Sequence, residues 1–400
     1  MNIIPNYIDP GTGSLLISLL ISFVLSIIFS VRTLFYKIIL FFSGKEHKGS
    51  NDFENKLVFY CEGKNYWNVF KPVLDELIKN KQKFIYLTSD NDDIGLQINS
   101  EFCSSYYIGN INQSFFFLNK LKAKMCVTTT PQLNILAWKR SKNVKHYCYL
   151  SHAPMDVHAN KKFSFDYYDS VLCGNNYQIT NLRQLERDRK SKAKVLMKTG
   201  CTYYDLITEN NCDQKDFILI SPTWGERSFF SLNGEVLVKE LLKGKHKVLY
   251  RPHPQSWISE KKFIDSITLK FQSNESFEVD NRVNNSYALS NAKAMITDTS
   301  SGIIYDVAFL HKIPIIAVNF KYDDGGYESS NIENPPSTKY LLEDCGEIIS
   351  EDEISDINTI IKKVTKFKIT KEIIDKHIFN FHIAGKVAAK QILTIYKNIE

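Results

Sequence analysis

Residues 296–318 read ITDTSSGIIYDVAFLHKIPIIAV, and this stretch predicts a strand, a turn, a helix and a second strand. The first apolar run ends at Asp298, and three hydroxyl residues and Gly302 form the turn before the helical stretch. Serine and threonine at such a turn cap a helix by accepting hydrogen bonds from its first N–H groups. The same N–H groups also bind anions such as phosphate. Both interpretations, a helix cap and a phosphate site, remain open from these letters alone.

The same alternation of apolar runs and helical stretches extends in both directions from this unit. Strand-like runs occur at 56–63, 83–89, 104–110, 125–130, 144–152, 169–175 and 193–200, and again at 217–224, 246–254, 277–280, 292–298 and 314–318. Helical stretches occur at 66–80 and 112–124, and a long one closes the chain at 371–399. This alternation is typical of parallel sheets with helices on both faces. We therefore expect an α/β protein with two doubly wound, Rossmann-like domains facing a cleft.

The expected organisation has three parts. Residues 1–48 form a membrane anchor and juxtamembrane segment, 49–210 a first, acceptor-side domain, and 211–400 a second, donor-binding domain that includes the closing helix. In doubly wound domains, ligands bind outside the carboxyl ends of the strands. The sequence therefore predicts a site where those ends meet in the cleft between the domains.

The N-terminal stretch Ser14–Val31 contains no charged residue and has only serine as polar residue. Eighteen residues in a helix reach roughly 27 Å, close to the thickness of the hydrocarbon core of a bilayer. Positive charges follow this stretch, so the positive-inside rule places the rest of the chain in the cytoplasm. We expect a single-pass protein of the cell membrane with cytoplasmic catalytic domains. A buried helix of a soluble protein is the alternative.

Composition limits the classes of partner. The chain has 400 residues and a formal net charge of +6, which suits anionic partners but does not demand nucleic acid, and none is expected. Its eight cysteines are scattered without metal-site or disulfide spacing, which predicts buried free thiols. We expect no metal and no cofactor.

Several chemically suitable residues follow predicted strands. In ISPTWGE, Thr223 comes just after a predicted strand, in LYRPHPQ Arg251 and His253 come after another, and in YLSHAPMDVH His152 comes after a strand of the first domain. Each has an ordinary structural explanation when it is taken alone. Together with Ser300 and Ser301 they predict one site for an anion and for proton transfer, because parallel strands end at one edge.

The motifs ISPTWGE (220–226), YRPHPQ (250–255) and ITDTSSGIIYDVAF (296–309) resemble, in order and spacing, the second half of the CDP-glycerol glycerophosphotransferases, which polymerise teichoic acids. SHAPMDVH (151–158) and FSFDYYDSVLCGNNYQ (163–178) resemble the first-domain acceptor loop and following strand of that family. The resemblance covers roughly residues 145–320 and implies a fold of the GT-B type. Carried over by position, it implies a donor site lined by His152, Ala153, Pro154, Asp156, Pro222, Thr223, Arg251, Pro252, His253, Thr299, Ser300, Ser301 and Asp306.

Three departures from the family pattern bear on the donor. The family loop usually reads His-Gly, whereas this chain has His152 and Ala153. Tyr203 in GCTYYD stands where the family has an arginine, and one additional residue separates Ser301 from Asp306. Loss of a cation beside a diphosphate weakens that contact or signals a different donor.

The resemblance implies a transferase that moves glycerol phosphate, or a related polyol phosphate, from a CDP-activated donor and releases CMP. The acceptor is a hydroxyl of an envelope polymer or glycolipid. His152 is the expected base, because an imidazole near its unperturbed pKa accepts a hydroxyl proton. Arg251, a cationic His253 and the N–H groups at Ser300 and Ser301 are expected to stabilise the departing phosphate.

Two alternatives remain open. One is a GT-B glycosyltransferase that uses a nucleotide sugar to build capsule or envelope polysaccharide. The other is a non-catalytic, membrane-bound scaffold, which the changes at Ala153 and Tyr203 allow and the presence of His152 and His253 opposes. The sequence names neither the acceptor, nor primase or polymerase behaviour, nor the oligomeric state.

Overall fold

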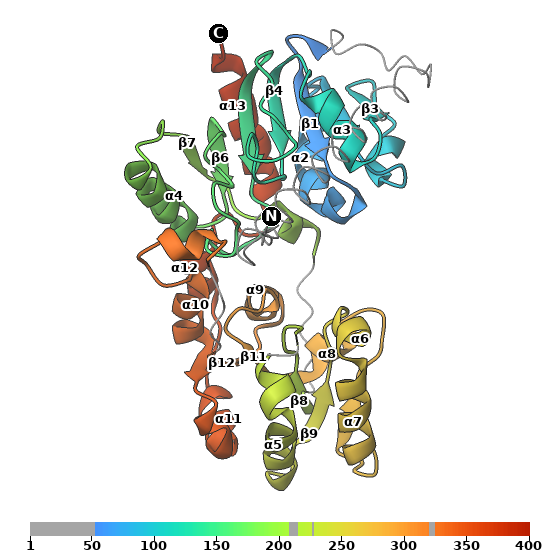
Figure 1. The fold of residues 1–400 in the computed structure, drawn as a ribbon, viewed down its shortest axis with the longest axis vertical. Coiled ribbons are helices and arrows are strands. Elements are labelled where there is room, and N and C mark those ends of the chain that lie inside the picture. The colour runs from blue at the N-terminus through green and yellow to red at the C-terminus, as the bar shows by residue number, and fades with distance from the viewer. Residues whose placement is uncertain (1–52, 208–214, 226–227, 320–324) are drawn as a thin grey trace, which may run out of the picture. The chain divides into compact units, whose positions relative to one another are not determined.

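Two β-sheets in which all strands are parallel form the framework of the protein (Figure 1). They belong to one unit, Ser50–Glu400, of which this computed structural model describes residues 53–400 except 208–214, 226–227 and 320–324. Among these described residues no helix has the length and apolar character needed to cross a membrane. The predicted anchor at 14–31 lies outside them and stays a prediction.

The first sheet has seven strands in the order β3-β2-β1-β4-β5-β6-β7. Its strands are β1 (Leu57–Cys61), β2 (Phe84–Thr88), β3 (Cys103–Tyr107), β4 (Ala123–Thr128), β5 (Val144–Leu150), β6 (Ser170–Cys173) and β7 (Val195–Lys198). The α-helices between them are α2 (Trp67–Lys79), α3 (Ile111–Leu118) and α4 (Asn176–Asp188), with 3-10 helices η2 (Lys64–Tyr66), η3 (Ile94–Gln97) and η4 (Thr202–Leu206). The strand order reverses direction between β1 and β4.

The second sheet repeats this order with six strands, β10-β9-β8-β11-β12-β13. Its strands are β8 (Phe217–Ile220), β9 (Lys247–Tyr250), β10 (Phe277–Val279), β11 (Ala292–Asp298), β12 (Ile315–Val318) and β13 (Gly346–Ile349). Its helices are α5 (Phe229–Lys243), α6 (Ser256–Ser259), α7 (Lys261–Phe271), α8 (Ser286–Asn291), α9 (Ile303–Asp306), η5 (Val307–His311), η6 (Glu328–Asn331), α10 (Ser337–Cys345), η7 (Asp352–Asp356) and α11 (Ile357–Val364). Here the order reverses between β8 and β11.

Alternate residues of each central strand face opposite hydrophobic cores, as the two-residue period of a strand requires. In β1, Leu57 and Phe59 pack with residues of α2, whereas Val58 and Tyr60 pack with residues of α3 and α4. A parallel strand covered on both faces is apolar along its whole length. This explains why the sequence shows continuous apolar runs and not a polar–apolar alternation.

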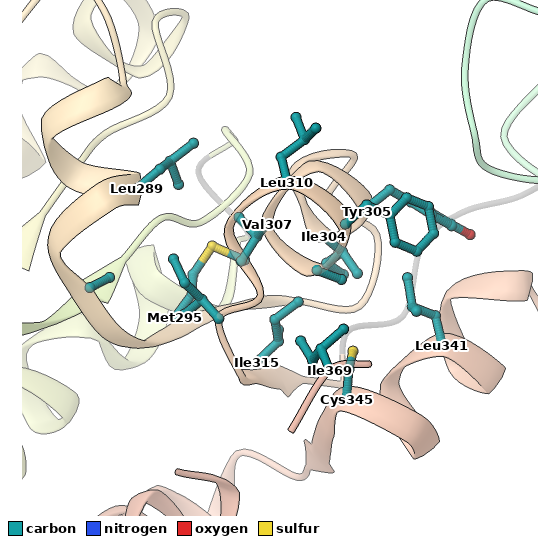
Figure 2. Close-up of a cluster of buried hydrophobic side chains, with 14 of the residues drawn as sticks. Leu289, Met295, Ile304, Tyr305, Val307, Leu310, Ile315, Leu341, Cys345 and Ile369 are labelled. Atoms are coloured by element: carbon teal, nitrogen blue, oxygen red, sulfur yellow. The ribbon is translucent and has the colours of Figure 1, made fainter. Parts of the chain in front are cut away.

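One core of the second sheet lies under the stretch 296–318. Figure 2 shows Ile304, Val307 and Leu310 of α9 and η5 beside Met295 and Ile315 of the sheet. Leu341, Cys345 and Ile369 continue this core. The helical turn after Gly302 is therefore fixed by burial of its apolar face against the sheet.

The strand predictions are confirmed, with one strand missed. β13 follows α10 directly and reads Gly-Glu-Ile-Ile, in which two apolar residues are too short a run to predict a strand. The predicted helix at 112–124 ends at Leu118, because β4 begins at Ala123. The described cysteines are all free thiols, as expected.

The closing stretch at 371–399 is two helices and not one. α12 (Lys371–His377) and α13 (Ala384–Asn398) are separated by a segment in which Asn380 and His382 have positive φ angles. α13 packs on the core of the first sheet, where Ala388 and Ile392 join Leu57 and Phe59 (Figure 1). The prediction had assigned this helix to the second domain. The small side chains of Ala388 and Ala389 allow α13 to pack closely on this core. The exact domain boundaries stay predictions.

Because α13 completes the first core, we expect Ala388→Asp to lower the free energy of unfolding by about 3–5 kcal/mol, the range for an uncompensated buried charge. The matched control Lys390→Asp places the same carboxylate on the exposed face of α13 and is expected to change stability by less than about 0.5 kcal/mol. Urea unfolding measures both values. Equal stabilities of the two variants would contradict the packing of α13 on the first sheet.

Candidate functional site

The carboxyl ends of the second sheet bring together loops that are far apart in the sequence. Thr223 follows β8, Arg251 and His253 follow β9, and Ser300 and Ser301 follow β11. β8 and β11 are paired neighbours, with Ile220 opposite Ile296, at the position where the strand order reverses. In doubly wound folds this switch point is where ligands bind.

Asp298, the last residue of β11, joins the two loops at this switch point. Its side chain is 1% exposed, and its Oδ2 accepts hydrogen bonds from the Thr223 N–H and hydroxyl, both at 2.7 Å. Its Oδ1 accepts hydrogen bonds from the Ser300 N–H at 3.2 Å and from the Ser300 hydroxyl. The sequence pattern predicts Asp298 only as the end of a strand. Its position directly before three hydroxyl residues was the available signal.

The turn after Asp298 does not form a simple serine cap. α9 begins after Gly302, and no side chain accepts a hydrogen bond from its first turn, because the Ser300 hydroxyl is turned back to Asp298. The Ser301 N–H donates to the Asp298 carbonyl at 3.1 Å. Ser300 is exposed, Ser301 and Pro222 are buried, and Thr299 is partly exposed. The phosphate interpretation stays a prediction.

The loop of the first domain that carries His152 approaches this turn. A Cβ atom added to Gly302 would lie 3.3 Å from the Met155 Cε atom, so the two loops are in contact range. Met155 also packs against the core that contains Ile304. The structure therefore brings the loop at 151–158 and the turn at 298–302 together, although 140 residues or more separate them in the chain.

Arg251 forms an ion pair inside the protein. Its Nη1 atom donates to Asp280 Oδ2 at 2.6 Å, and Arg282 donates to the other oxygen at 2.8 Å. Burial alone would raise the pKa of Asp280, but the hydrogen bonds from Arg282 and Arg251 outweigh it and lower the pKa. The charge of Arg251 is thus partly compensated by Asp280, a partner that the sequence analysis did not anticipate. Pro252, next to it, is buried.

His253 was expected to be a cation, and its surroundings favour the neutral form. Partial desolvation lowers its pKa, against a smaller opposing effect of Glu260. Its Nδ1 atom accepts the Gln255 N–H at 3.1 Å, which places the ring proton on Nε2. The imidazole is exposed and presents an N–H donor instead of a full positive charge.

His152 is partly exposed, and other residues hold its ring in place. Nδ1 lies 3.0 Å from the Tyr149 hydroxyl oxygen, and the Tyr66 ring packs edge-on with a centroid distance of 5.3 Å. Desolvation lowers the pKa of His152, while a hydrogen bond to the Thr129 backbone acts in the opposite direction. The ring is therefore neutral near pH 7, the protonation state that a base requires.

Asp156 lies between the two sheets and not at an open surface. It is buried, and its carboxylate accepts the Ser337 N–H at the start of α10 and contacts His158 Nδ1 at 2.9 Å. The Asp156 N–H in turn donates to the Ser337 hydroxyl at 3.1 Å. These polar contacts hold α10 to the first-domain loop, and the ligand contact implied by the resemblance stays a prediction.

The two residues before Met155 also use their backbone internally. The Ala153 carbonyl accepts hydrogen bonds from Ser151 and Gln178, and the Pro154 carbonyl accepts one from Asn175. Both carbonyls are therefore tied to the start of α4. The loop that carries His152 is held in one conformation by these bonds.

Tyr203, which stands where the resemblance implies an arginine, contacts Asp306. Its hydroxyl donates to Asp306 Oδ1, and the Tyr204 hydroxyl donates to the same oxygen at 2.8 Å. Burial raises the pKa of Asp306, and the two tyrosine hydrogen bonds act against this rise. Asp306 therefore joins η4 to the second sheet, and neutral donors satisfy it where an arginine would supply a charge.

Within residues 53–400, outside the gaps, no group of three metal-ligating side chains could hold a metal ion. Asp90 and Asp92 do have a D-x-D spacing after β2. Asp90 accepts the Asp92 N–H at 2.9 Å and the Lys64 N–H at 3.1 Å, and Lys64 also lies 3.6 Å from Asp92. This pair of carboxylates is part of a loop with a compensating cation.

Comparisons with known proteins agree with this architecture. No protein-family model matches the chain, and no curated protein matches it. UDP-GlcNAc 2-epimerase from Methanocaldococcus jannaschii, solved with UDP-GlcNAc and UDP, is 15% identical with a TM-score of 0.51, over 85% of this chain and 99% of that one. The fold is of the GT-B type.

Two further solved structures support the same fold. UDP-GlcNAc 2-epimerase from Neisseria meningitidis, bound to UDP-GlcNAc, is 10% identical with a TM-score of 0.53, over 85% of this chain and 100% of that one. UDP-N-acetylglucosamine 2-epimerase from Rickettsia bellii is 12% identical with a TM-score of 0.55, over 86% and 97%. At these identities the likeness concerns the fold and not the reaction.

We predict that Asp298→Ala lowers the free energy of unfolding by about 2–4 kcal/mol, because each hydrogen bond to a charged group contributes about 1.5–3 kcal/mol and the loops partly rearrange. The matched control Asp216→Ala removes an exposed carboxylate that forms a surface ion pair with Lys247, and is expected to cost under about 1 kcal/mol. A double-mutant cycle with Thr223→Val measured by urea unfolding tests the contact. Additive effects of the two changes would contradict it.

Proposed function

We propose that the chain is a transferase that moves a group from a nucleotide-linked donor to a hydroxyl of an acceptor. In this proposal the donor binds at the carboxyl edge of the second sheet and the acceptor at that of the first. The observation that carries it is the arrangement at the β8–β11 switch point, where Asp298 fixes Thr223 and Ser300 and the His152 loop comes within contact range of Gly302.

A nucleotide sugar is the first candidate donor. The GT-B fold and the likeness to epimerases solved with UDP-GlcNAc support a nucleoside diphosphate attached to a sugar. Arg251 is paired with Asp280, and the pKa of His253 is lowered, so the site offers little free positive charge. This suits the transfer of an uncharged sugar. The reaction would then be glycosyl transfer for capsule or envelope polysaccharide.

CDP-glycerol, or a related CDP-polyol, is the second candidate donor. The motifs at 220–226, 250–255 and 296–309 support it, since they occur in the family order and follow β8, β9 and β11. Tyr203 in place of arginine argues against an unchanged donor. The acceptor in this case is an envelope polymer or glycolipid at the membrane, and the stretch at 14–31 is the proposed anchor.

Both donors require the same balance of bonds. The acceptor oxygen forms a bond to the sugar C1 atom or to the phosphorus that carries glycerol. The bond from that atom to the nucleotide phosphate oxygen breaks, and UDP or CMP leaves with the electron pair. The hydroxyl proton moves to His152, which is neutral. N–H groups and hydroxyls at the β8–β11 switch point stabilise the leaving phosphate.

Calorimetry with CDP-glycerol and with UDP-GlcNAc tests the donor. We expect one of them to bind the full-length chain, and Ser300→Ala with Ser301→Ala to weaken that binding by about 10- to 100-fold, since a hydrogen bond to a charged oxygen contributes about 1.5–3 kcal/mol. Ser266→Ala, an exposed serine of α7, is the control and is expected to leave affinity unchanged. Unchanged affinity in the double variant would place the phosphate elsewhere, and absence of binding by either nucleotide would favour the scaffold.

The role of His152 predicts a specific pH dependence. A base acts when it is unprotonated, and the pKa of His152 lies below its usual value of 6.5, so transfer falls only as pH drops below 6.5. His152→Ala is expected to remove this limb and to reduce kcat by about 100-fold or more, with nucleotide affinity nearly unchanged. A pH profile of transfer at saturating donor measures both effects. Loss of nucleotide binding in this variant would assign His152 to the donor pocket.

A further inference from the structure

The first sheet has a pocket on one side of its switch point. It has a volume of about 560 Å³ and lies at the carboxyl ends of β1, β2 and β3. Glu62 and Tyr66 follow β1, Asp90 follows β2, and Tyr107 is the last residue of β3. This volume is within the range of about 300–1,000 Å³ that small-molecule sites occupy.

Glu62 directly follows β1, the strand that corresponds in the first sheet to β8 in the second. Thr130, whose side chain lowers the pKa of Glu62, follows β4. β1 and β4 are the neighbours between which the strand order reverses. Burial raises the pKa of Glu62 and outweighs the effect of Thr130. A partly buried carboxyl at this point is a strong hydrogen-bond acceptor for a ligand hydroxyl.

The pocket lining contains groups that recognise hydroxyls. Four amide side chains line it: Asn65, Asn91, Asn110 and Asn112. Among the described residues, Asn65, Asn91 and Asn112 have no hydrogen-bonding partner for their side chains, and all three are exposed. Each amide offers two donors and one acceptor, which matches an alcohol, itself a donor and an acceptor. Two tyrosine rings supply apolar faces beside these polar groups.

The charges of the lining disfavour an anion. Glu62 and Asp90 are acidic and Lys64 is basic, and Lys64 already lies 3.6 Å from Asp92 at the rim. A phosphate placed here would meet two carboxylates and one cation that is already compensated. The negative charges of a phosphate and of these carboxylates would repel each other in a partly desolvated pocket. A neutral ligand has no such cost.

We infer that this pocket binds the end of the acceptor as an uncharged sugar or polyol, and does not bind a phosphate-bearing end. The inference rests on the proposed transferase function and names the acceptor class for it. Tyr66 lines the pocket and also packs edge-on against the His152 ring, with 5.3 Å between the two ring centroids, so the pocket borders a residue that contacts the proposed base. Acceptor polymers would therefore be recognised by their neutral units.

Saturation-transfer NMR with the full-length chain tests the inference. The neutral probes are glucose, N-acetylglucosamine, glycerol and ribitol, and their charged counterparts are glucose 6-phosphate and glycerol 3-phosphate. We expect at least one neutral probe to bind, with an affinity at least fivefold above that of its phosphorylated counterpart. The double variant Asn65→Ala with Asn112→Ala is expected to weaken this binding at least fivefold. Asn68→Ala, an exposed amide one turn further on that does not line the pocket, is the matched control.

Circular dichroism establishes that the variants are folded, and calorimetry with CDP-glycerol and UDP-GlcNAc on the same variants separates the two proposals. Unchanged nucleotide binding with lost sugar binding supports the pocket assignment. Preference for the phosphorylated probes, binding that is unaffected by the double variant, or no binding of any neutral probe would overturn it. Absence of nucleotide binding would overturn the proposed function, while the NMR result still decides what the pocket binds.

Discussion

The buried carboxylate of Asp298 is the interaction on which the arrangement of the second sheet's loops depends. Two neighbouring strands, β8 and β11, send their following loops in different directions, because the strand order reverses between them. A carboxylate is buried at low cost only when hydrogen bonds satisfy it. Asp298 meets this condition by accepting from Thr223 on one loop and Ser300 on the other. The requirement to satisfy one charge therefore fixes the position of both loops.

The two sheets solve the same geometric problem with different partners. In the first sheet, Glu62 after β1 interacts with Thr130 after β4, and Glu62 also lines an open pocket. In the second sheet, Asp298 is enclosed, and the exposed residues at the edge include Trp224, His253 and Ser300. The carboxyl edge of the first sheet thus has a pocket lined with amides and carboxyls, whereas the switch point of the second sheet is lined with hydroxyls and N–H groups. This difference supports different ligand classes at the two edges.

The electrostatics of the second edge restrict how a phosphate could be held there. Its described carboxylates Glu260, Asp280 and Asp298 are buried, and Asp280 compensates both Arg251 and Arg282. A diphosphate would therefore depend mainly on oriented N–H groups and hydroxyls and less on cations. Tyr203 has the same consequence, because its hydroxyl satisfies Asp306 without adding a positive charge. This setting is compatible with the departures from the CDP-glycerol family that the sequence displays.

The sequence by itself determined the fold class and the approximate positions of all strands except β13. Apolar runs such as 217–220 and 292–298 mark buried parallel strands, and local side-chain patterns are sufficient to recognise them. The residues after those runs, including Thr223, His253 and Ser300, could be selected because parallel strands share one carboxyl edge. Only the tertiary structure decided which of the candidate residues have a hydrogen-bonding or ion-pair partner inside the protein. Asp280 for Arg251, Ser337 for Asp156 and Tyr203 for Asp306 come from 29, 181 and 103 residues away. The packing of α13 on the first sheet was likewise undetermined, because an apolar helix face fits any apolar surface and only the completed fold selects one.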